Sequence, residues 1–232
     1  QGGFDSFQLG QAGQLSAIRG LVSLHNTGGA DDVIVDASAH TTGTKLHITS
    51  NAVGADPSDT LFGPGGSLQF DGLSGRLIVN LGSGADSVIA APNATARIEL
   101  TGGAPTTTPG DRLTFDLVDT SFISYSPFFF RYTFSNRQYV MRTGFEVTTV
   151  LGDFNGDGIA NGLDANIVAM NWLAFPAGNA TVADGDANGD GFVNGLDANV
   201  LAMNWLKGLS AQAQGGAPTV TSSRTVDFNG SA

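Results

Sequence analysis

One segment of the chain is present twice, and this duplication restricts the fold more than any other feature. The first copy begins at Gly152 and the second spans residues 185–206, thirty-three residues further on, with 17 of 22 positions identical. Each copy reads D-x-N-x-D-G and has a third aspartate at the twelfth position. Two copies this similar are expected to fold into two equivalent units.

The spacing of oxygen-bearing side chains in each copy is typical of a calcium-binding loop. Positions 1, 3, 5 and 12 supply side-chain oxygens, position 7 supplies its backbone carbonyl, and position 9 lies near a bound water. Glycine at position 6, which is Gly158 or Gly191, permits the sharp turn. An Asx-rich turn that binds nothing is the alternative, and the second matched copy argues against it. We predict two Ca²⁺ ions with these ligands: Asp153, Asn155, Asp157, Ile159, Asn161 and Asp164, and in the second loop Asp186, Asn188, Asp190, Phe192, Asn194 and Asp197.

Each loop is followed by a short helical pattern. Residues 165–173 and 198–206 repeat apolar side chains at helical spacing. Residues 148–150, before the first loop, read as the end of a strand, and residues 178–181, before the second, read as loop. A loop-then-helix unit used twice without an entering helix resembles the dockerin module. The resemblance covers residues 152–207 and implies two calcium ions and two antiparallel helices related by a pseudo-twofold axis.

One departure from the dockerin pattern concerns the partner. Cellulosomal dockerins recognise a cohesin partly through small hydroxyl residues just before the last ligand. This chain has Gly162-Leu163 and Gly195-Leu196 at those positions. The resemblance therefore implies the calcium fold, whereas the cohesin partner does not carry over directly.

The composition excludes several functional classes. The net charge is -11, so the basic surface that nucleic-acid binding requires is missing, and we predict no nucleic-acid partner. We also predict no membrane span, because every apolar run is too short. Cysteine is absent, and secreted bacterial proteins can use calcium in place of disulfides as a staple. We therefore expect an extracellular protein, secreted or at the cell surface, and a mature chain that begins at Gln1.

The first 150 residues read as short β-strands in a loose repeat. An aspartate followed by apolar residues recurs near Asp31, Asp59, Asp86 and Asp111, at spacings of 28, 27 and 25 residues. Such a repeat suits one coil of a β-solenoid, and a β-sandwich is the alternative. The predicted fold class is mainly β, with a small all-α calcium module. The glycine-aspartate turns also resemble the G-x-G-x-D repeats of large bacterial, planctomycete-like surface proteins.

Residues 112–150 differ from the repeats. Longer aromatic runs on both sides of a turn at Ser135-Asn136 indicate antiparallel strands. We expect them to cap the open end of the β body, because an uncovered sheet edge promotes aggregation. The predicted divisions are 1–150 for the β body, 151–207 for the calcium module, and 208–232 for a linker and a C-terminal strand.

The C-terminal tail has strand character from Thr219 to Phe228. An isolated strand cannot satisfy its own backbone N–H and C=O groups, so we expect it to pair with a sheet edge. That edge belongs either to a neighbouring copy of the chain or to the chain's own β body.

No catalytic motif is recognisable, and we predict that the chain is not an enzyme. The three histidines lack metal spacing such as H-E-x-x-H, and G-x-S-x-G is absent. Glu99 and Glu146, the only glutamates, would form a glycosidase pair only if the fold brought them together.

Three N-x-S/T sequons begin at Asn93, Asn179 and Asn229. All three lie in predicted loops or in the tail. We expect a glycan on at least one of them, with Asn93 favoured because it lies on a turn between two predicted strands.

These features support three functional hypotheses. The leading one is a secreted, non-catalytic, calcium-binding structural protein that assembles with copies of itself into a filament or surface layer. The second is a docking subunit whose dockerin-like module binds a cohesin-like receptor. The third is a carbohydrate-active protein.

Overall fold

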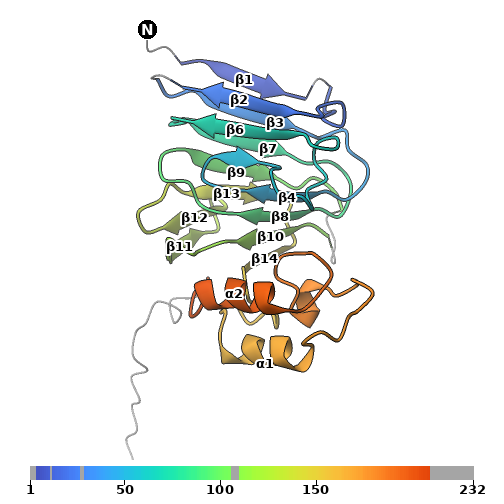
Figure 1. Ribbon diagram of the computed structural model, residues 1–232. Coiled ribbons are helices and arrows are strands. Elements are labelled where there is room, and N and C mark those ends of the chain that lie inside the picture. The colour runs from blue at the N-terminus through green and yellow to red at the C-terminus, as the bar shows by residue number, and fades with distance from the viewer. Residues whose placement is uncertain (1–3, 11, 27–28, 106–109, 210–232) are drawn as a thin grey trace, which may run out of the picture.

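The computed structural model describes residues 4–10, 12–26, 29–105 and 110–209. Two stacked β-sheets form a body, and a helical module lies against one end of it (Figure 1). The first sheet has the order β1 (Ser6–Leu9), β3 (Asp32–Asp36), β7 (Arg76–Asn80), β9 (Arg97–Thr101), β13 (Val140–Thr143), β12 (Arg131–Phe134) and β11 (Phe122–Ser126). The second has the order β14 (Val147–Val150), β10 (Arg112–Phe115), β8 (Ser87–Ala90), β4 (Lys45–Ile48), β5 (Ala52–Val53), β6 (Ser67–Asp71) and β2 (Leu21–His25).

The chain passes back and forth between these two sheets, so that successive windings lie side by side. Most neighbouring strands are therefore parallel, as between β3 and β7 or between β8 and β10. The mainly β prediction is confirmed. Within the described residues, the strands form two stacked seven-stranded sheets, and the β-solenoid stays a prediction.

The structure differs from the sequence prediction over residues 112–150. Only β11, β12 and β13 pair in antiparallel fashion there. β13 runs parallel to β9, and β10 and β14 run parallel to each other. The aromatic runs resembled hairpin strands, but β10 and β14 keep the register of the preceding windings and continue the second sheet.

The recurrent aspartates have a structural role at the beginnings of strands. Asp86 precedes β8 and Asp111 precedes β10, and the register places them on adjacent windings. Asp111 Oδ1 accepts a hydrogen bond from the Asp86 N–H at 2.8 Å, and Asp86 Oδ1 accepts one from the Thr44 N–H at 2.6 Å. Each carboxylate thus satisfies a backbone donor of the neighbouring winding. Asp59 begins no strand, but its Oδ1 accepts a hydrogen bond from the His47 N–H at 2.8 Å.

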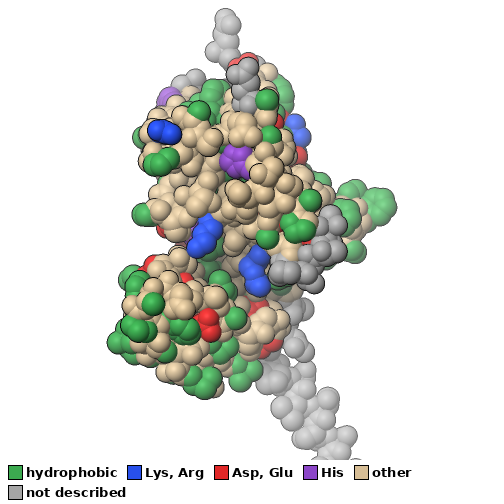
Figure 2. Space-filling model, turned by 90° about the vertical axis from the view of Figure 1, so that its right-hand side faces the viewer, with side chains coloured by type: hydrophobic (Ala, Val, Ile, Leu, Met, Phe, Trp, Pro, Cys, Tyr) green, Lys and Arg blue, Asp and Glu red, His purple; other side chains and the backbone are tan. Residues whose placement is uncertain are grey.

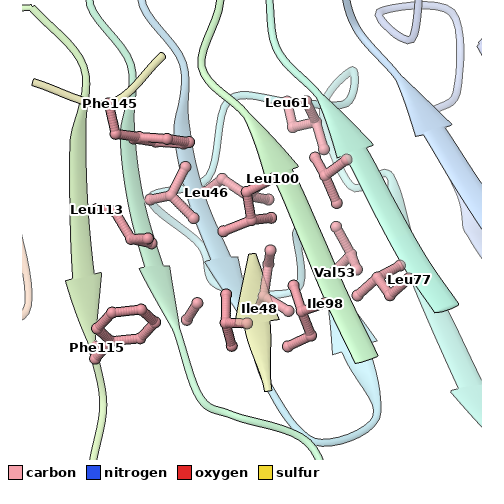
Figure 3. Close-up of a cluster of buried hydrophobic side chains, with 14 of the residues drawn as sticks. Leu46, Ile48, Val53, Leu61, Leu77, Ile98, Leu100, Leu113, Phe115 and Phe145 are labelled. Carbon is pink, nitrogen blue, oxygen red and sulfur yellow. The ribbon is translucent and has the colours of Figure 1, made fainter. Parts of the chain in front are cut away.

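The core is a continuous apolar layer between the two sheets (Figure 3). Alternate residues of each strand point into it, including Leu77 and Val79 from β7 and Leu113 and Phe115 from β10, and all four are essentially inaccessible to solvent. Burial of each side chain of this size contributes about 1.5–3 kcal/mol. This layer is the main stabilising feature of the body.

The two ends of the body are different. At the end formed by β1 and β2, Phe4 and Leu21 are 66% and 56% exposed. At the other end, the apolar core continues into the helical module through Phe154, Val168 and Leu201. The module therefore covers this end of the body, below β14 in Figure 1, in the place where the sequence suggested an antiparallel cap.

Polar contacts also hold the module against the body. Asn204 is fully buried, and its Oδ1 accepts a hydrogen bond from the Leu117 N–H at 3.0 Å. Lys207 Nζ donates to the Thr120 carbonyl oxygen at 2.6 Å. None of the described helices has the length and hydrophobicity to cross a membrane.

Candidate metal centre

The module contains two helices, α1 (Gly162–Met170) and α2 (Gly195–Met203), each preceded by one of the duplicated loops. Both helices begin and end three residues earlier than the sequence pattern suggested. The reason is a capping box: the Asn161 Oδ1 atom accepts a hydrogen bond from the Leu163 N–H, and the Asp164 side chain accepts one from the Asn161 N–H, each at 2.8 Å. The second unit repeats this cap around Asn194. Loop position 9 is thus the helix cap, and position 12 lies in the first helical turn.

The carboxylates at positions 1 and 12 of the first loop are buried and held by backbone donors. Asp153 Oδ1 accepts a hydrogen bond from the Gly156 N–H at 2.8 Å, and Asp153 Oδ2 accepts one from the Gly158 N–H at 3.0 Å. Asp164 is fully buried, and its Oδ1 accepts from the Phe154 N–H at 2.7 Å. These bonds fold the loop around its own acidic side chains.

The remaining predicted ligands of this loop are more exposed. Asn155 Oδ1 accepts a hydrogen bond from the Asp157 N–H at 2.8 Å, and Asn155 Nδ2 donates to Asp157 Oδ2 at 3.0 Å. The Ile159 carbonyl accepts from Asn161 Nδ2 at 3.1 Å. The structure thus links the predicted ligands at positions 3 and 5, and those at positions 7 and 9, by direct hydrogen bonds.

The second loop has a similar network. Asp186 accepts from the N–H groups of Gly189 and Gly191 at 2.8 and 2.9 Å. Asp197, fully buried, accepts from Ala187 N–H at 2.8 Å. Asn188 Nδ2 donates to Asp190 Oδ2 at 3.0 Å, and the Asp190 N–H donates to Asn188 Oδ1 at 3.0 Å. The Phe192 N–H donates to Asp190 Oδ1 at 2.9 Å, and the Asn194 N–H donates to Asp197 Oδ2 at 2.8 Å. The first loop also has a contact with the body: the Thr149 hydroxyl of β14 donates to Asp153 Oδ2 at 2.5 Å.

Glycine is required at position 6 of each loop. Gly158 and Gly191 have φ angles of +91° and +86°. An L-residue adopts this left-handed region only with strain. The predicted sharp turn is therefore present in both loops.

The charge of the loops favours a bound cation. Burial raises the pKa of Asp186, and repulsion from Asp197 and Asp190 adds to the rise, whereas hydrogen bonds from Gly191 and Gly189 oppose it. Concentrating three carboxylates in one loop is unfavourable unless positive charge is supplied. A divalent cation would supply that charge.

The donor set fits calcium, although carboxylates alone do not make the site. Among the described residues, no group of three or more His, Cys, Asp and Glu side chains is arranged to hold a metal ion. The predicted set in each loop also includes two asparagines and a carbonyl, and the carboxylates are engaged by backbone N–H groups. All of these donors are oxygens, which is the ligand preference of Ca²⁺.

The two units pack together symmetrically. Leu173 N–H donates to the Val193 carbonyl at 2.9 Å, and Leu206 N–H donates to the Ala160 carbonyl at 2.8 Å, so each unit closes on the loop of the other. An apolar groove of about 320 Å³ lies between the helices, with Trp172 and Trp205 among its lining residues. Figure 2 shows hydrophobic side chains gathered on the visible surface of the module.

Comparison with known families agrees with this geometry. The family model described as "Dockerin type I domain" matches residues 151–206. The chain contains a dockerin-like module. Neither the curated proteins nor the solved structures include a match to this chain. Dockerin domains bind calcium and are non-catalytic docking domains, typically of extracellular or cell-surface proteins.

The structure also places the other predicted site residues. Asn93 is 6% exposed, and its Nδ2 donates to the Ser50 carbonyl at 2.7 Å, so its amide is engaged inside the folded chain. Asn179 is exposed. Asn229 and the predicted tail strand lie outside the described residues. The glutamates have separate partners: Glu99 forms an ion pair with Arg76, and Glu146 accepts from the Asp111 N–H.

Sequence reasoning missed the residues that join the module to the body. Asn204 repeats Asn171 of the first unit, so the duplication gave no sign that only Asn204 contacts Leu117. The sequence pattern around Thr149 indicates only the end of a strand. The position of Thr149 four residues before the first loop aspartate was the available signal.

Proposed function

We propose that this chain is an extracellular docking protein whose dockerin-like module binds a cohesin-like receptor in the presence of calcium. The observation that carries the proposal is the dockerin family match over a duplicated loop-helix pair with an exposed apolar surface. In this proposal, docking of the module to its receptor fixes the position of the β body. Nothing in this role requires catalysis by the chain itself.

The docking surface is proposed to be apolar. Leu163 and Leu196 stand where cellulosomal dockerins have small hydroxyl residues, and they are 58% and 59% exposed. Trp172 and Trp205 are also exposed beside the groove. Large exposed apolar side chains of this kind are typical of protein interfaces. A receptor that fits this module should therefore present apolar side chains in place of hydrogen-bonding ones.

Calcium holds this surface in place in our proposal. Each loop takes one Ca²⁺ through the six oxygen donors predicted from the sequence, giving two ions per module. Asp164 and Asp197 belong both to the ion site and to the first turn of a helix. Loading of each loop should therefore order the helix that carries the exposed leucine.

Binding to a panel of purified cohesin domains tests the docking proposal. We expect at least one complex in surface plasmon resonance with calcium and its loss in EDTA. Leu163→Asp combined with Leu196→Asp should weaken it at least tenfold, because charged groups would enter an apolar contact. Phe128→Ser, on an exposed turn of the β body, is the control and should leave affinity unchanged. Equal binding by both variants would contradict the proposed surface.

Self-assembly is a second candidate function, supported by the open end of the body. β1 and β2 are outer strands of their sheets, and Phe4, Phe7 and Leu21 are exposed there. Uncovered strand edges pair readily with other strands. We propose that the C-terminal segment of another copy pairs at this end. Sedimentation velocity should show assemblies of the full chain that disappear when residues 216–232 are deleted, whereas a monomeric full chain at high concentration would exclude this role.

Glycosylation of at least one sequon stays a prediction, but the favoured acceptor is now Asn179 and no longer Asn93. Asn179 is the favoured acceptor, because it is exposed in the loop between the two units, whereas the Asn93 amide is buried. Intact mass spectrometry of protein from its native source should show added mass, and peptide mapping should place it at Asn179. A mass equal to that of the bare chain would remove this prediction.

A further inference from the structure

The hairpin formed by β11 and β12 carries exposed aromatic side chains at its turn. β11 is an outer strand of the first sheet, and both strands lie at one side of the body in Figure 1. Ser126 of β11 is opposite Arg131 of β12, and the turn between them presents three phenylalanines. Phe128, Phe129 and Phe130 are 83%, 54% and 49% exposed. Three consecutive exposed aromatic residues form an apolar tip, which differs from the single apolar side chains scattered over an ordinary surface.

The backbone of this turn is strained at one of the three phenylalanines. Phe130 has a φ angle of +49°, in the left-handed region that a bulky L-residue adopts only at a cost. Glycine or asparagine would form the same turn more easily and without an exposed ring. Strain of this kind is typical of functional positions. The aromatic ring of Phe130 therefore has a role other than turn formation.

The hairpin is basic, although the chain as a whole is acidic. Residues 120–145 include three arginines and no aspartate or glutamate, in a chain whose net charge is -11. Arg97 of β9 adds to this basic region, because β9 is paired with β13 of the same segment. The region therefore attracts anions, whereas the remainder of the chain repels them.

Two of these arginines lie against one aromatic ring and have no acidic partner. The Cζ atoms of Arg97 and Arg131 are 6.0 and 5.2 Å from the centroid of the Tyr139 ring, and Arg131 is also 5.8 Å from the Phe129 ring. Neither arginine forms a salt bridge within the described residues, and Glu99, two residues along β9 from Arg97, pairs with Arg76. Arg131 Nε is buried and makes no hydrogen bond there.

This combination identifies the chemistry of the ligand. A guanidinium group that stacks on an aromatic ring keeps N–H donors at its edge, and these donors suit phosphate oxygens. The phenylalanine tip next to Arg131 needs an apolar environment. A ligand with anionic groups beside apolar chains satisfies both requirements, and a surface of anionic lipids has this composition. A lipid surface also accepts a convex tip without needing a pocket of matching shape.

We propose that the β11–β12 hairpin binds an anionic lipid surface. The side chains of Phe128, Phe129 and Phe130 enter the apolar layer, and Arg97 and Arg131 contact lipid phosphate groups. The contact is peripheral and requires no spanning helix. The acidic remainder of the chain is repelled by the same surface, so the molecule approaches it with the hairpin first. The lipid contact is separate from the dockerin-like module and does not depend on docking.

Flotation of the full-length chain with vesicles tests this proposal. We expect binding to vesicles of phosphatidylcholine and phosphatidylglycerol in equal amounts, and at least tenfold weaker binding to vesicles of phosphatidylcholine alone. High salt should reduce the binding, because it screens the arginine–phosphate attraction. Phe128→Ser with Phe129→Ser, and Arg97→Gln with Arg131→Gln, should each weaken it at least tenfold. Phe4→Ser with Leu21→Ser, at the opposite end of the body, is the matched apolar control and should bind like the unaltered chain.

A fluorescent label gives a second measurement that does not depend on removing side chains of the site. The chain has no cysteine, so Pro127→Cys allows an environment-sensitive dye to be attached beside the tip. Its emission should shift to shorter wavelength with the anionic vesicles, whereas the same dye on Asn179→Cys in the module should show no shift.

Three results would overturn the proposal. They are equal flotation of the tip variant and the unaltered chain, the absence of a shift from the dye at Pro127→Cys, and a change in the sedimentation of the lipid-free chain caused by the tip substitutions. The last result would assign the hairpin to a contact between copies of the chain. None of these results bears on binding of the module to a cohesin domain, which is measured without lipid.

Discussion

At the scale of single residues, identical side chains of the duplicated segment have different tasks. Asn171 Nδ2 donates to the Asp184 carbonyl at 2.8 Å inside the module, whereas Asn204 accepts from the Leu117 N–H of the body. Asn204→Ala should destabilise the chain by about 1–3 kcal/mol, because it leaves a buried N–H without a partner. Urea unfolding in calcium measures this, with Asn166→Ala on the exposed side of α1 as control. Equal stability of the two variants would contradict the role of Asn204.

Burial raises the pKa of Asp86 to about 6, and the charge of Asp111 adds to the rise. This raised pKa predicts a pH dependence of opposite sign to the usual one for a carboxylate. In the calcium-free chain, the folded state holds its proton up to about pH 6, whereas the unfolded state loses it near 3.8. The stability that this proton provides is full below pH 3.8 and is lost as pH rises through about 6. Relative to Asp86→Asn, the unaltered chain should therefore lose stability between pH 4 and 7 in EDTA. A constant difference between the two chains across this range would contradict the prediction.

At the scale of elements, the loop-helix unit depends on its left-handed glycine. Gly158→Ala places a Cβ at φ +91°, which costs about 1–2 kcal/mol. Because loop folding and ion binding are coupled, calorimetry should show about tenfold weaker calcium binding at the first loop. Gly162→Ala is the matched control, since Gly162 lies in the first turn of α1, where a Cβ would meet nothing within 4 Å. Similar affinities for the two variants would exclude backbone strain as the reason for this glycine.

Some of these elements could be predicted from the sequence, and others could not. The loops were predictable because their ligand spacing is local, and the strands around Leu77 and Ile98 because they alternate. The pairing of β13 with β9, which places Val140 beside Ile98, was not predictable. Between these two strands the chain crosses to the second sheet to form β10 and then returns to the first. The helices begin three residues before the start that the apolar spacing indicates, because the Asn161 cap determines where α1 begins and Asn194 does the same for α2.

At the scale of the whole molecule, the module and the body share one apolar core. Asp153 lies just after β14, and its side chain accepts a hydrogen bond from the Thr149 hydroxyl. The first loop is therefore joined directly to β14, an outer strand of the second sheet. Phe154 and Leu201 extend the core of the body. The module therefore covers one end of the body, in addition to the docking role that we propose for it.

This shared core predicts that loss of loop binding weakens the body as well as the module. Asp157→Ala with Asp190→Ala should leave the module disordered even in calcium, because the remaining carboxylates repel one another without an ion. The uncovered end of the body then exposes apolar surface to water, which lowers its stability. Thermal unfolding followed by the β-sheet signal of circular dichroism should show a melting temperature several degrees lower than in the unaltered chain. Asn166→Ala with Asn199→Ala, exposed on both helices, is the control. An unchanged melting temperature of the body would mean that the module is an appendage that contributes no cover.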